Sequence, residues 1–444
     1  HYGYNKVSPW IPGNFLSMGD PHYIPDDNVM VKETHVFSPN LLNVAQFSWI
    51  SIDGKEAPPA GIPTYSSLGM KLNQDFTSSG NMGLYAYDWM YAPGAWPVTW
   101  DRKSYQYGDD LHLVHGKHSL GFGALVMRSS FNTLNAYNQG PSFDFSGEET
   151  GGLLSDGSQL SDGFSLASMA LGAVYNFTQA VPSTSLLSQW YIGVYAQDNY
   201  HVAPRLTLNL GMRWEPFLPW IADDGKVSHF SPAAYTAGTI STQFPNAPPG
   251  VSFPGDPGFP NGDAGVGSNM IGFAPRAGFA YDIQGNGKSS IRGGFGMFYE
   301  TSQVAVTNMP FNTNPFTFGL TLDVDQAGPF ANPYSGTVAD PFPAAPPGPS
   351  ATFPGYPAIM TYDPYHYKYQ TPVDYDWNLT YEQQLTENLL FRLGYVGNHG
   401  SHGLETWELN PAVYTPGGDN GTGTNARRLF PGIGNITDLV HDVN

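Results

Sequence analysis

Residues 189–215 read QWYIGVYAQDNYHVAPRLTLNLGMRWE, and the alternation of apolar and polar side chains in this stretch decides the fold. In its second half, Leu206, Leu208, Leu210, Met212 and Trp214 alternate with Thr207, Asn209, Gly211, Arg213 and Glu215. Successive side chains of a β-strand point to opposite faces, so this run predicts a strand with one apolar and one polar face. Residues 189–201 alternate in the same way before a short break at 202–205. The two runs together predict an antiparallel hairpin.

The same arrangement of two alternating runs and a tight turn occurs three more times. The pairs are 104–114 with 119–128, 275–283 with 289–300, and 376–385 with 389–398, joined at 115–118, 284–288 and 386–388. Weaker strand candidates are 33–37, 42–52 and 83–91, and the few segments that could be helical, such as 160–174, are short. The chain is therefore predicted to be all-β and antiparallel, with short turns at one end of the strands.

Long segments rich in proline separate the pairs at their other end. The stretches FPNAPPG at 244–250 and PFPAAPPGP at 341–349 cannot continue a β-ladder, because proline has no amide donor. We expect long loops over about 221–270, 301–375 and 400–444. A β-barrel of the bacterial outer membrane has this asymmetry, with long loops outside the cell and short turns in the periplasm.

The length and the charges of the runs fit a membrane. Ten residues at about 3.3 Å each, tilted by about 45°, span roughly 23 Å, close to the apolar band of an outer-membrane barrel. Arg213 or Arg292 facing lipid near the midplane would cost about 2–4 kcal/mol, so the arginine-bearing face is expected to line the lumen. Aromatic residues lie toward the loop end of the strands, as in an interfacial girdle: Trp190, Trp214, Phe273, Tyr299, Trp377 and Tyr395. Alternation would also suit a soluble β-sandwich, in which the same rings would pack in a core.

Composition excludes several classes of protein. A net charge of −19 with 18 Lys and Arg argues against a nucleic-acid partner. The absence of cysteine excludes disulfides, thiolate zinc sites and cysteine nucleophiles. The sequence contains no run of 18 apolar residues, so no transmembrane helix is predicted. The opening residues HYGYN do not resemble a signal peptide.

Candidate catalytic and metal sites are weak. His112 with His115, and His399 with His402, have spacings that could hold a metal, but neither pair has further ligands in a recognisable arrangement. Asp156 and Asp162 lack the spacing of a calcium loop, and the run GGFG at 293–296 falls inside a predicted strand and is no phosphate cradle. We predict no catalytic, cofactor or metal site, and we expect Arg213, Glu215, Arg276, Arg292, Glu382 and Arg392 to form charge ladders in the lumen.

The strand motifs resemble those of a known family. Residues 190–200 and 206–216, followed by 273–282, 287–299, 377–380, 395–400 and 409–414, are similar to the barrel of TonB-dependent receptors. More narrowly they resemble the Oar-like receptors, which carry a carboxypeptidase-regulatory-like domain ahead of the plug. The resemblance covers about the last 60% of the chain strongly and the first part loosely.

The resemblance implies an outer-membrane receptor that binds an extracellular ligand and imports it when a TonB complex acts on its plug. Such barrels have about 22 strands, so residues 1–444 are expected to be a portion of one, with the plug and the N-terminal domain outside this chain. The expected partners are outer-membrane lipid, the TonB complex and a ligand whose identity the motifs do not reveal. Two alternatives stay open: a non-transporting surface or adhesion protein on the same scaffold, and a secreted β-rich carbohydrate-active enzyme. We predict that the chain is not an enzyme, because the motifs are strand patterns without a catalytic signature.

Overall fold

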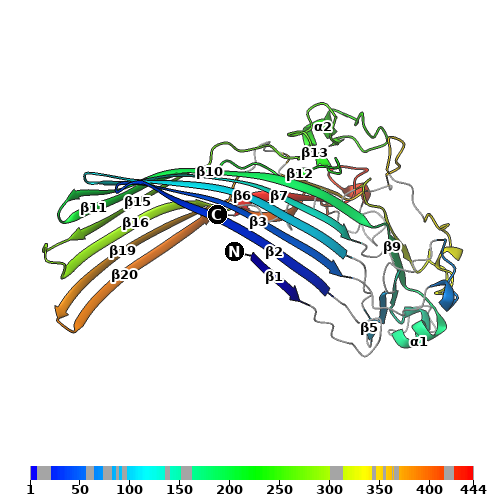
Figure 1. Cartoon of the computed structure of the whole chain (residues 1–444). Coiled ribbons are helices and arrows are strands. Elements are labelled where there is room, and N and C mark those ends of the chain that lie inside the picture. Colours follow the sequence, from blue (N-terminus) through cyan, green and yellow to red (C-terminus); the bar gives the residue numbers. More distant parts are fainter. Residues whose placement is uncertain are drawn as a thin grey trace.

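The computed structural model is dominated by one curved antiparallel sheet with folded loops at one end (Figure 1). The structure describes residues 2–7, 22–56, 65–73, 83–86, 90–92, 98–135, 141–151, 163–300, 314–342, 347–353, 357–362, 364, 370–414 and 425–443. Within these residues the main sheet has twelve strands, and eleven of them follow one another in the order β1-β2-β3-β6-β7-β10-β11-β15-β16-β19-β20. The twelfth, β12 (Ile221–Ala222), pairs with β10. Each strand lies beside its predecessor, as in an up-and-down barrel wall.

The strands of the main sheet form five hairpins with tight turns. Their bounds are β1 (Tyr2–Val7), β2 (His22–Ser38), β3 (Leu41–Glu56), β6 (Val98–His115), β7 (His118–Asn135), β10 (Ser183–Ala203), β11 (Leu206–Trp214), β15 (Phe273–Asp282), β16 (Ser289–Tyr299), β19 (Val373–Thr386) and β20 (Leu389–Ser401). All four predicted hairpins are confirmed with their turns, and the weaker candidates at 33–37 and 42–52 form part of the hairpin β2–β3. The third weak candidate, 83–91, instead contributes two short strands to a loop sheet, β4 (Gly83–Ala86) and β5 (Met90–Ala92).

Several strands are longer than the ten residues expected from the membrane thickness. Strands β6 and β7 have 18 residues each and β10 has 21. At the same rise and tilt, 21 residues extend about 50 Å, roughly twice the apolar band of an outer-membrane barrel. The sequence-based estimate was wrong here because the ladder continues past the alternating part. The extra residues of β7 and β10 at the loop end pack Phe131 and Leu187 against Trp220 and Val227 of a loop.

The loop end carries small sheets and the hydrophobic cores. A five-stranded sheet joins β4 and β5 to β8 (Ser142–Phe145), β9 (Asn176–Ala180) and β17 (Gly319–Asp323). A three-stranded sheet holds β18 (Ile359–Tyr362), β21 (Gly403–Glu408) and β22 (Ile436–Val443), and a two-stranded one holds β13 (His229–Phe230) and β14 (Val251–Ser252). The helices are short: α1 (Ser165–Leu171), inside the segment expected to be helical, and α2 (Pro232–Thr236). The predicted long loops therefore contain ordered elements, because their aromatic and aliphatic side chains can bury one another.

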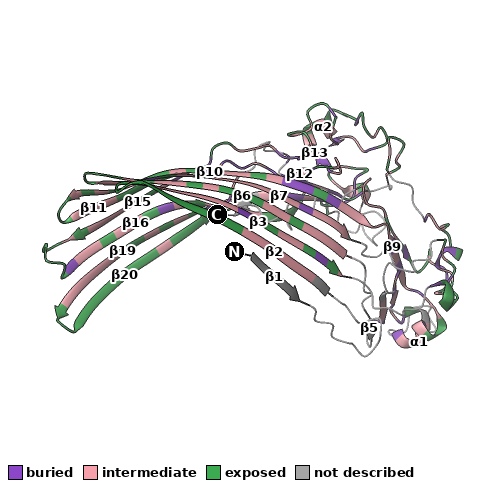
Figure 2. Ribbon diagram, viewed as in Figure 1, coloured by how far each residue is buried: buried purple, intermediate pink, exposed green. Residues whose placement is uncertain are grey.

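The register gives the main sheet one apolar and one polar face. Tyr195 pairs with Arg213 while Ala196 pairs with Met212, so polar side chains of neighbouring strands share one face and apolar ones share the other. On the apolar face, Leu210 is 48% exposed and Phe391 is 45% exposed, and neither Leu208 nor Ile291 is buried. The largest fully buried side chains lie toward the loop end instead, and the strands carry mainly exposed and half-buried residues (Figure 2). This distribution contradicts a β-sandwich, in which the apolar face would be covered by a second sheet.

The apolar face includes a few polar side chains that were not predicted to lie there. Asp109 pairs with Ala45 and Ala124 on this face, and Asn43 donates a hydrogen bond of 2.8 Å to its carboxylate. Nearer the turns, His118 Nδ1 lies 2.6 Å from Asp198 Oδ2. These groups are paired with each other, which lowers the cost of their position. No helix among the described residues is long and apolar enough to cross a membrane.

The opposite faces of β19 provide a direct test of which side meets lipid. Leu379 is 46% exposed on the apolar face, and the neighbouring Asn378 lies on the polar face. We expect Leu379→Arg to lower the free energy of unfolding in lipid vesicles by about 2–4 kcal/mol. The matched change Asn378→Arg is expected to cost less than about 1 kcal/mol, because its side chain reaches water. Urea titration of the refolded proteins measures both values, and equal losses would contradict the assignment of the faces.

Candidate functional site

A ladder of hydrogen bonds crosses the polar face from β6 to β11. Tyr195 donates to Asp110 Oδ1 at 2.6 Å, across β7. Arg213 contacts Glu215 through its Nε at 2.5 Å and donates from Nη2 to the hydroxyl of Tyr191 at 2.9 Å. Tyr191 in turn donates to Glu215. Three strands are thereby joined by side chains as well as by the backbone.

Glycines in the intervening positions let these side chains lie flat on the sheet. A Cβ atom at Gly123 would overlap both the ring of Tyr195 and the carboxylate of Asp110. A Cβ atom at Gly193 would overlap the guanidinium of Arg213. The glycines on this face therefore have a packing role, which is a usual reason for glycine inside a strand.

The six charged residues predicted to form ladders fall into three groups. Arg213 and Glu215 belong to the ladder just described. Arg392 lies 2.6 Å and Arg292 3.8 Å from the carboxylate of Glu382, so these three form a second group across β16, β19 and β20. Arg276 does not join either group, and its guanidinium lies 4.5 Å from the ring centre of Phe298.

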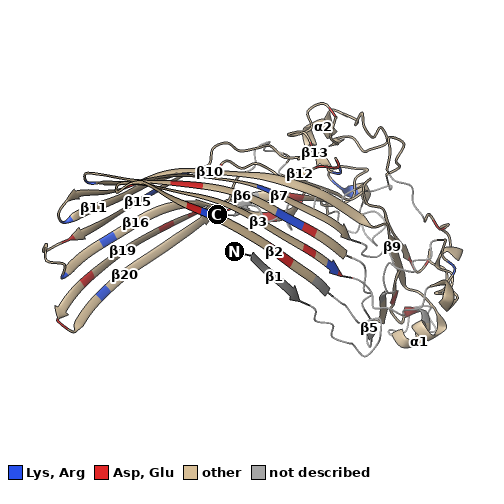
Figure 3. Ribbon diagram, viewed as in Figure 1, with Lys and Arg blue, Asp and Glu red and all other residues tan. Residues whose placement is uncertain are grey.

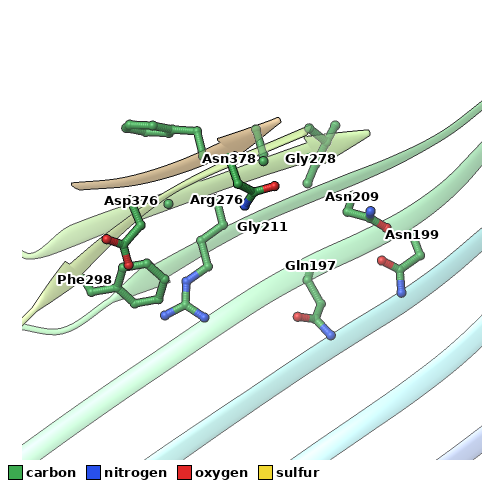
Figure 4. Close-up of a pocket in the computed structure, with 14 residues that line it drawn as sticks. Gln197, Asn199, Asn209, Gly211, Arg276, Gly278, Phe298, Asp376 and Asn378 are labelled. Atoms are coloured by element: carbon green, nitrogen blue, oxygen red, sulfur yellow. The ribbon is translucent and has the colours of Figure 1, made fainter. Parts of the chain in front are cut away.

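A hollow on this face lies beside Arg276 and has a volume of about 450 Å³ (Figure 4). Two rows of paired residues cross it: Asn199, Asn209, Gly278, Gly294 and Asn378 in one, and Gln197, Gly211, Arg276, Gly296 and Asp376 in the other. The glycines of each row leave the space, and the longer polar side chains surround it. The hollow thus offers amide donors and acceptors, one guanidinium and one carboxylate, a set that can hydrogen-bond a polar solute.

The amide side chains of these rows were not predicted to be site residues. Gln197, Asn199 and Asn209 were assigned only to the polar face, and Asp376 and Asn378 were not discussed as site residues. Their common feature in the sequence is a polar residue at alternate positions beside glycines on the same face. The alternation could have marked them, but only the register between strands shows that they meet.

A second hollow, of about 370 Å³, lies in the loop region around β13, α2 and β14, and His229 and Asp256 are among its lining residues. Burial lowers the pKa of His229 to about 4, although a backbone hydrogen bond at Gly265 acts in the opposite direction. Burial alone would raise the pKa of Asp256, but hydrogen bonds from Ser241, Thr242 and backbone amides hold it below its usual value. These bonds fasten the turn at 241–244 to Asp256, so the carboxylate organises the wall of the hollow.

The other candidates from the sequence do not assemble into sites. His112 and His115 are an odd number of residues apart on β6 and point to opposite faces. No group of three or more His, Asp and Glu side chains that could hold a metal occurs among the described residues. Gly293 to Gly296 lie in β16 and pair with both β15 and β19, as expected for a strand, whereas Asp156 and Asp162 lie outside the described residues.

Comparison with known proteins identifies one family model. The model described as "Outer membrane beta barrel domain" matches residues 1–444. No curated protein matches the chain.

Solved structures with similarity to the chain include outer-membrane transport proteins. The outer membrane transporter YddB from Escherichia coli is 11% identical with a TM-score of 0.48, covering 99% of this chain and 40% of its own. The ferric enterobactin receptor PfeA from Pseudomonas aeruginosa, as a double mutant, is 11% identical with a TM-score of 0.40, covering 95% of this chain and 39% of its own. The copper transporter OprC is 8% identical with a TM-score of 0.42, covering 96% and 43%. The chain therefore spans about 40% of the length of these proteins.

Gly123 provides a test of the ladder. We expect Gly123→Ala to lower the free energy of unfolding by about 1–3 kcal/mol, because the added methyl group displaces Tyr195 from Asp110 and leaves polar groups unpaired. Gly108→Ala is the control on the same face, since its Cβ would have 3.9 Å to the nearest atoms. We expect Gly108→Ala to change the free energy of unfolding by no more than about 0.5 kcal/mol. Chemical denaturation of both variants measures the difference, and equal stability of the two would argue against a packing role for Gly123.

Burial of His229 predicts a pH dependence for the loop region. Its folded pKa of about 4 lies below the usual 6.5, so its contribution to stability is complete above pH 6.5 and is lost as the pH falls toward 4. The full loss is on the order of 3 kcal/mol. Hydrogen exchange at Phe230 and Val251, corrected for intrinsic rates, is expected to show weaker protection at low pH. The variant His229→Phe removes the titrating group, and an unchanged pH dependence in this variant would contradict the assignment.

Proposed function

Because the chain belongs to the outer membrane β-barrel domain family and is located in the bacterial outer membrane, we propose that it forms part of the wall of a receptor that binds an extracellular ligand and imports it with TonB-coupled energy. The observation that carries the proposal is the 450 Å³ hollow on the polar face. In a barrel of this family the polar face lines the lumen. The hollow is then a place on the lumenal wall where a polar solute can be hydrogen-bonded without a covalent step.

The distribution of charge on the wall supports a passage for solutes. The ion pair of Arg213 with Glu215 leaves no excess charge at that point, and Glu382 offsets one of the two charges of Arg292 and Arg392. Around the hollow the uncharged amides of Gln197, Asn199 and Asn209 predominate. Amides can donate and accept at once, so they exchange partners readily with a moving polar ligand. The proposal assigns no catalytic role to any of these residues.

The proposed coupling to TonB rests on the strand motifs. The runs at 190–200, 206–216 and 287–299 resemble the Oar-like group of TonB-dependent receptors, and this resemblance supports TonB coupling. The ordered loops around Phe143, Phe177, Phe230 and Phe253 would be presented outside the cell in this orientation. Their extent also favours the runner-up, a surface or adhesion protein without transport.

Import can be tested before the ligand is identified. Wild-type and deletion strains are grown in the same complex medium, and mass spectrometry follows which solutes disappear. The proposal predicts at least one solute that only the wild type depletes, and collapse of the proton gradient is expected to stop its uptake. Identical depletion by both strains, together with a loss of surface adhesion in the deletion strain, would favour the runner-up.

A substitution in the hollow connects import to the site. Gly294→Leu places a side chain next to Asn378 and fills part of the hollow, so we expect the uptake rate of the depleted solute to fall about tenfold, equal to about 1.4 kcal/mol in the barrier. Gly394→Leu is the control, because Gly394 lies on the same face in β20 but outside the hollow. Uptake by intact cells, normalised to the amount of protein in the outer membrane, measures both. Equal uptake in the two variants would separate the hollow from transport.

A further inference from the structure

A row of basic residues lies at the turn end of three neighbouring hairpins. The residue immediately before each return strand is Lys117 before β7, Arg205 before β11 and Lys288 before β16. The equivalent residues of the two outer hairpins are Asn40 before β3 and Asn388 before β20. The chain has 37 Asp and Glu residues and only 18 Lys and Arg residues. Three basic residues at equivalent positions are therefore not expected from its composition.

The backbone shows that these positions are structurally equivalent. The carbonyl of Asn40 accepts a hydrogen bond from the amide of Val114, at the start of the next hairpin turn. In the same way, the carbonyls of Lys117, Arg205 and Lys288 accept from the amides of His201, Asp282 and Gln384, at 2.9, 2.9 and 2.7 Å. Neighbouring turns are two strands apart, so the cations form a row whose members are separated by about 9.6 Å in the direction across the strands. Basic residues appear at the tips of the hairpins in Figure 3.

The three side chains are available to a partner. All three residues are exposed. The ammonium of Lys117 donates to the carbonyl of Val202 at 3.0 Å, and the guanidinium of Arg205 lies against Gly285. These contacts hold the ammonium of Lys117 and the guanidinium of Arg205 at the edge of the sheet, and neither contact neutralises the positive charge.

Three cations and two nearby carboxylates, Asp282 and Asp198, leave one net positive charge on the row. Asp282 accepts hydrogen bonds from the amides of Gly285 and Gly287, and Arg205 also acts on it electrostatically. Asp198 is paired with His118. Glu387 lies in the turn of the last hairpin, β19–β20, beyond Lys288, so the positive row ends there.

The row lies where the apolar face ends. On that face, the rings of His118 and Tyr200 stack at 4.3 Å beside Lys117. Amphipathic rings are typical of the boundary between lipid chains and head groups. Cations just beyond such a boundary are at the level of the lipid phosphates.

We propose that Lys117, Arg205 and Lys288 bind the phosphates of anionic glycerophospholipids in the periplasmic leaflet. The leaflet follows from the orientation used above, in which the tight turns face the periplasm. Arginine can hold a phosphate with two parallel hydrogen bonds and lysine with a point charge, so the three side chains suit the same head groups. The proposal goes beyond ligand import and concerns how the barrel is anchored.

The test measures lipid binding to the purified protein by native mass spectrometry, with phosphatidylglycerol, phosphatidylcholine and lipid A offered separately. A juxtamembrane cation strengthens binding to an anionic lipid by about fivefold. Three such cations predict that phosphatidylglycerol binds on the order of 100-fold more tightly than phosphatidylcholine. The triple variant K117Q/R205Q/K288Q is expected to lose the preference. The control K32Q/K55Q/K71Q removes the same charge from exposed residues away from the turns and is expected to keep it.

Several outcomes would overturn the proposal. Equal binding of phosphatidylglycerol and phosphatidylcholine by the wild type, or a preference that survives in the triple variant, contradicts it. A loss of lipid A binding alone would place the row in the other leaflet, and full competition by inorganic phosphate would indicate a site for the free ion. If the triple variant does not fold, the single variants K117Q, R205Q and K288Q are each expected to lose about fivefold. No transport ligand enters this assay, so its result is independent of the proposed import.

Discussion

The antiparallel hydrogen-bond ladder is the constraint on which the rest of the structure depends. Lipid offers no partner for backbone amides and carbonyls, so every strand in the hydrocarbon layer must be paired with a neighbour. Along the path from β1 to β20, each strand between these two ends is paired on both sides. The pairs run without interruption for up to 18 residues between β6 and β7. Among the described residues, β1 and β20 are the edges of the sheet, and each needs a further partner in a membrane.

The register of that ladder creates both faces at once. A shift of one residue would exchange them, bringing Arg213 to the apolar face and Met212 to the polar face. With the observed register, glycines and long polar side chains fall in adjacent strands at the same level. Gly123 makes room for Tyr195 in this way, and Gly294 and Gly296 leave the hollow between the amides. The features of the polar face are therefore consequences of strand pairing, as is the row formed by Lys117, Arg205 and Lys288.

Alternation in single strands was enough to predict the hairpins, their turns and the two faces. It worked because the period of two is a local property, as in Leu206 to Glu215. It failed for the ends of β6, β7 and β10, which continue into loop packing where Phe131 and Leu187 meet Trp220. The order within the loops was also missed, because Phe143, Phe177 and Leu322 are brought together from distant parts of the chain.

The candidate site was only partly predictable for the same reason. The pairing of Arg213 with Glu215 could be anticipated from their spacing on one strand. The contact of Arg392 with Glu382 joins the two strands of one hairpin and also follows from its register. The two rows of the hollow, from Asn199 to Asn378 and from Gln197 to Asp376, cross five strands, so they depend on four registers in succession. A single strand does not contain that information.

The central claim is that the apolar face of the sheet contacts lipid and the polar face contacts water. The chain has no cysteine, so single cysteines can be introduced one at a time at residues 290–297 of β16 and spin-labelled in lipid vesicles. The account predicts that collisions with oxygen dominate at Ile291, Gly293, Phe295 and Met297, and that collisions with a water-soluble nickel chelate dominate at Ser290, Arg292, Gly294 and Gly296. The same accessibility at all eight positions, or the reverse alternation, would contradict it.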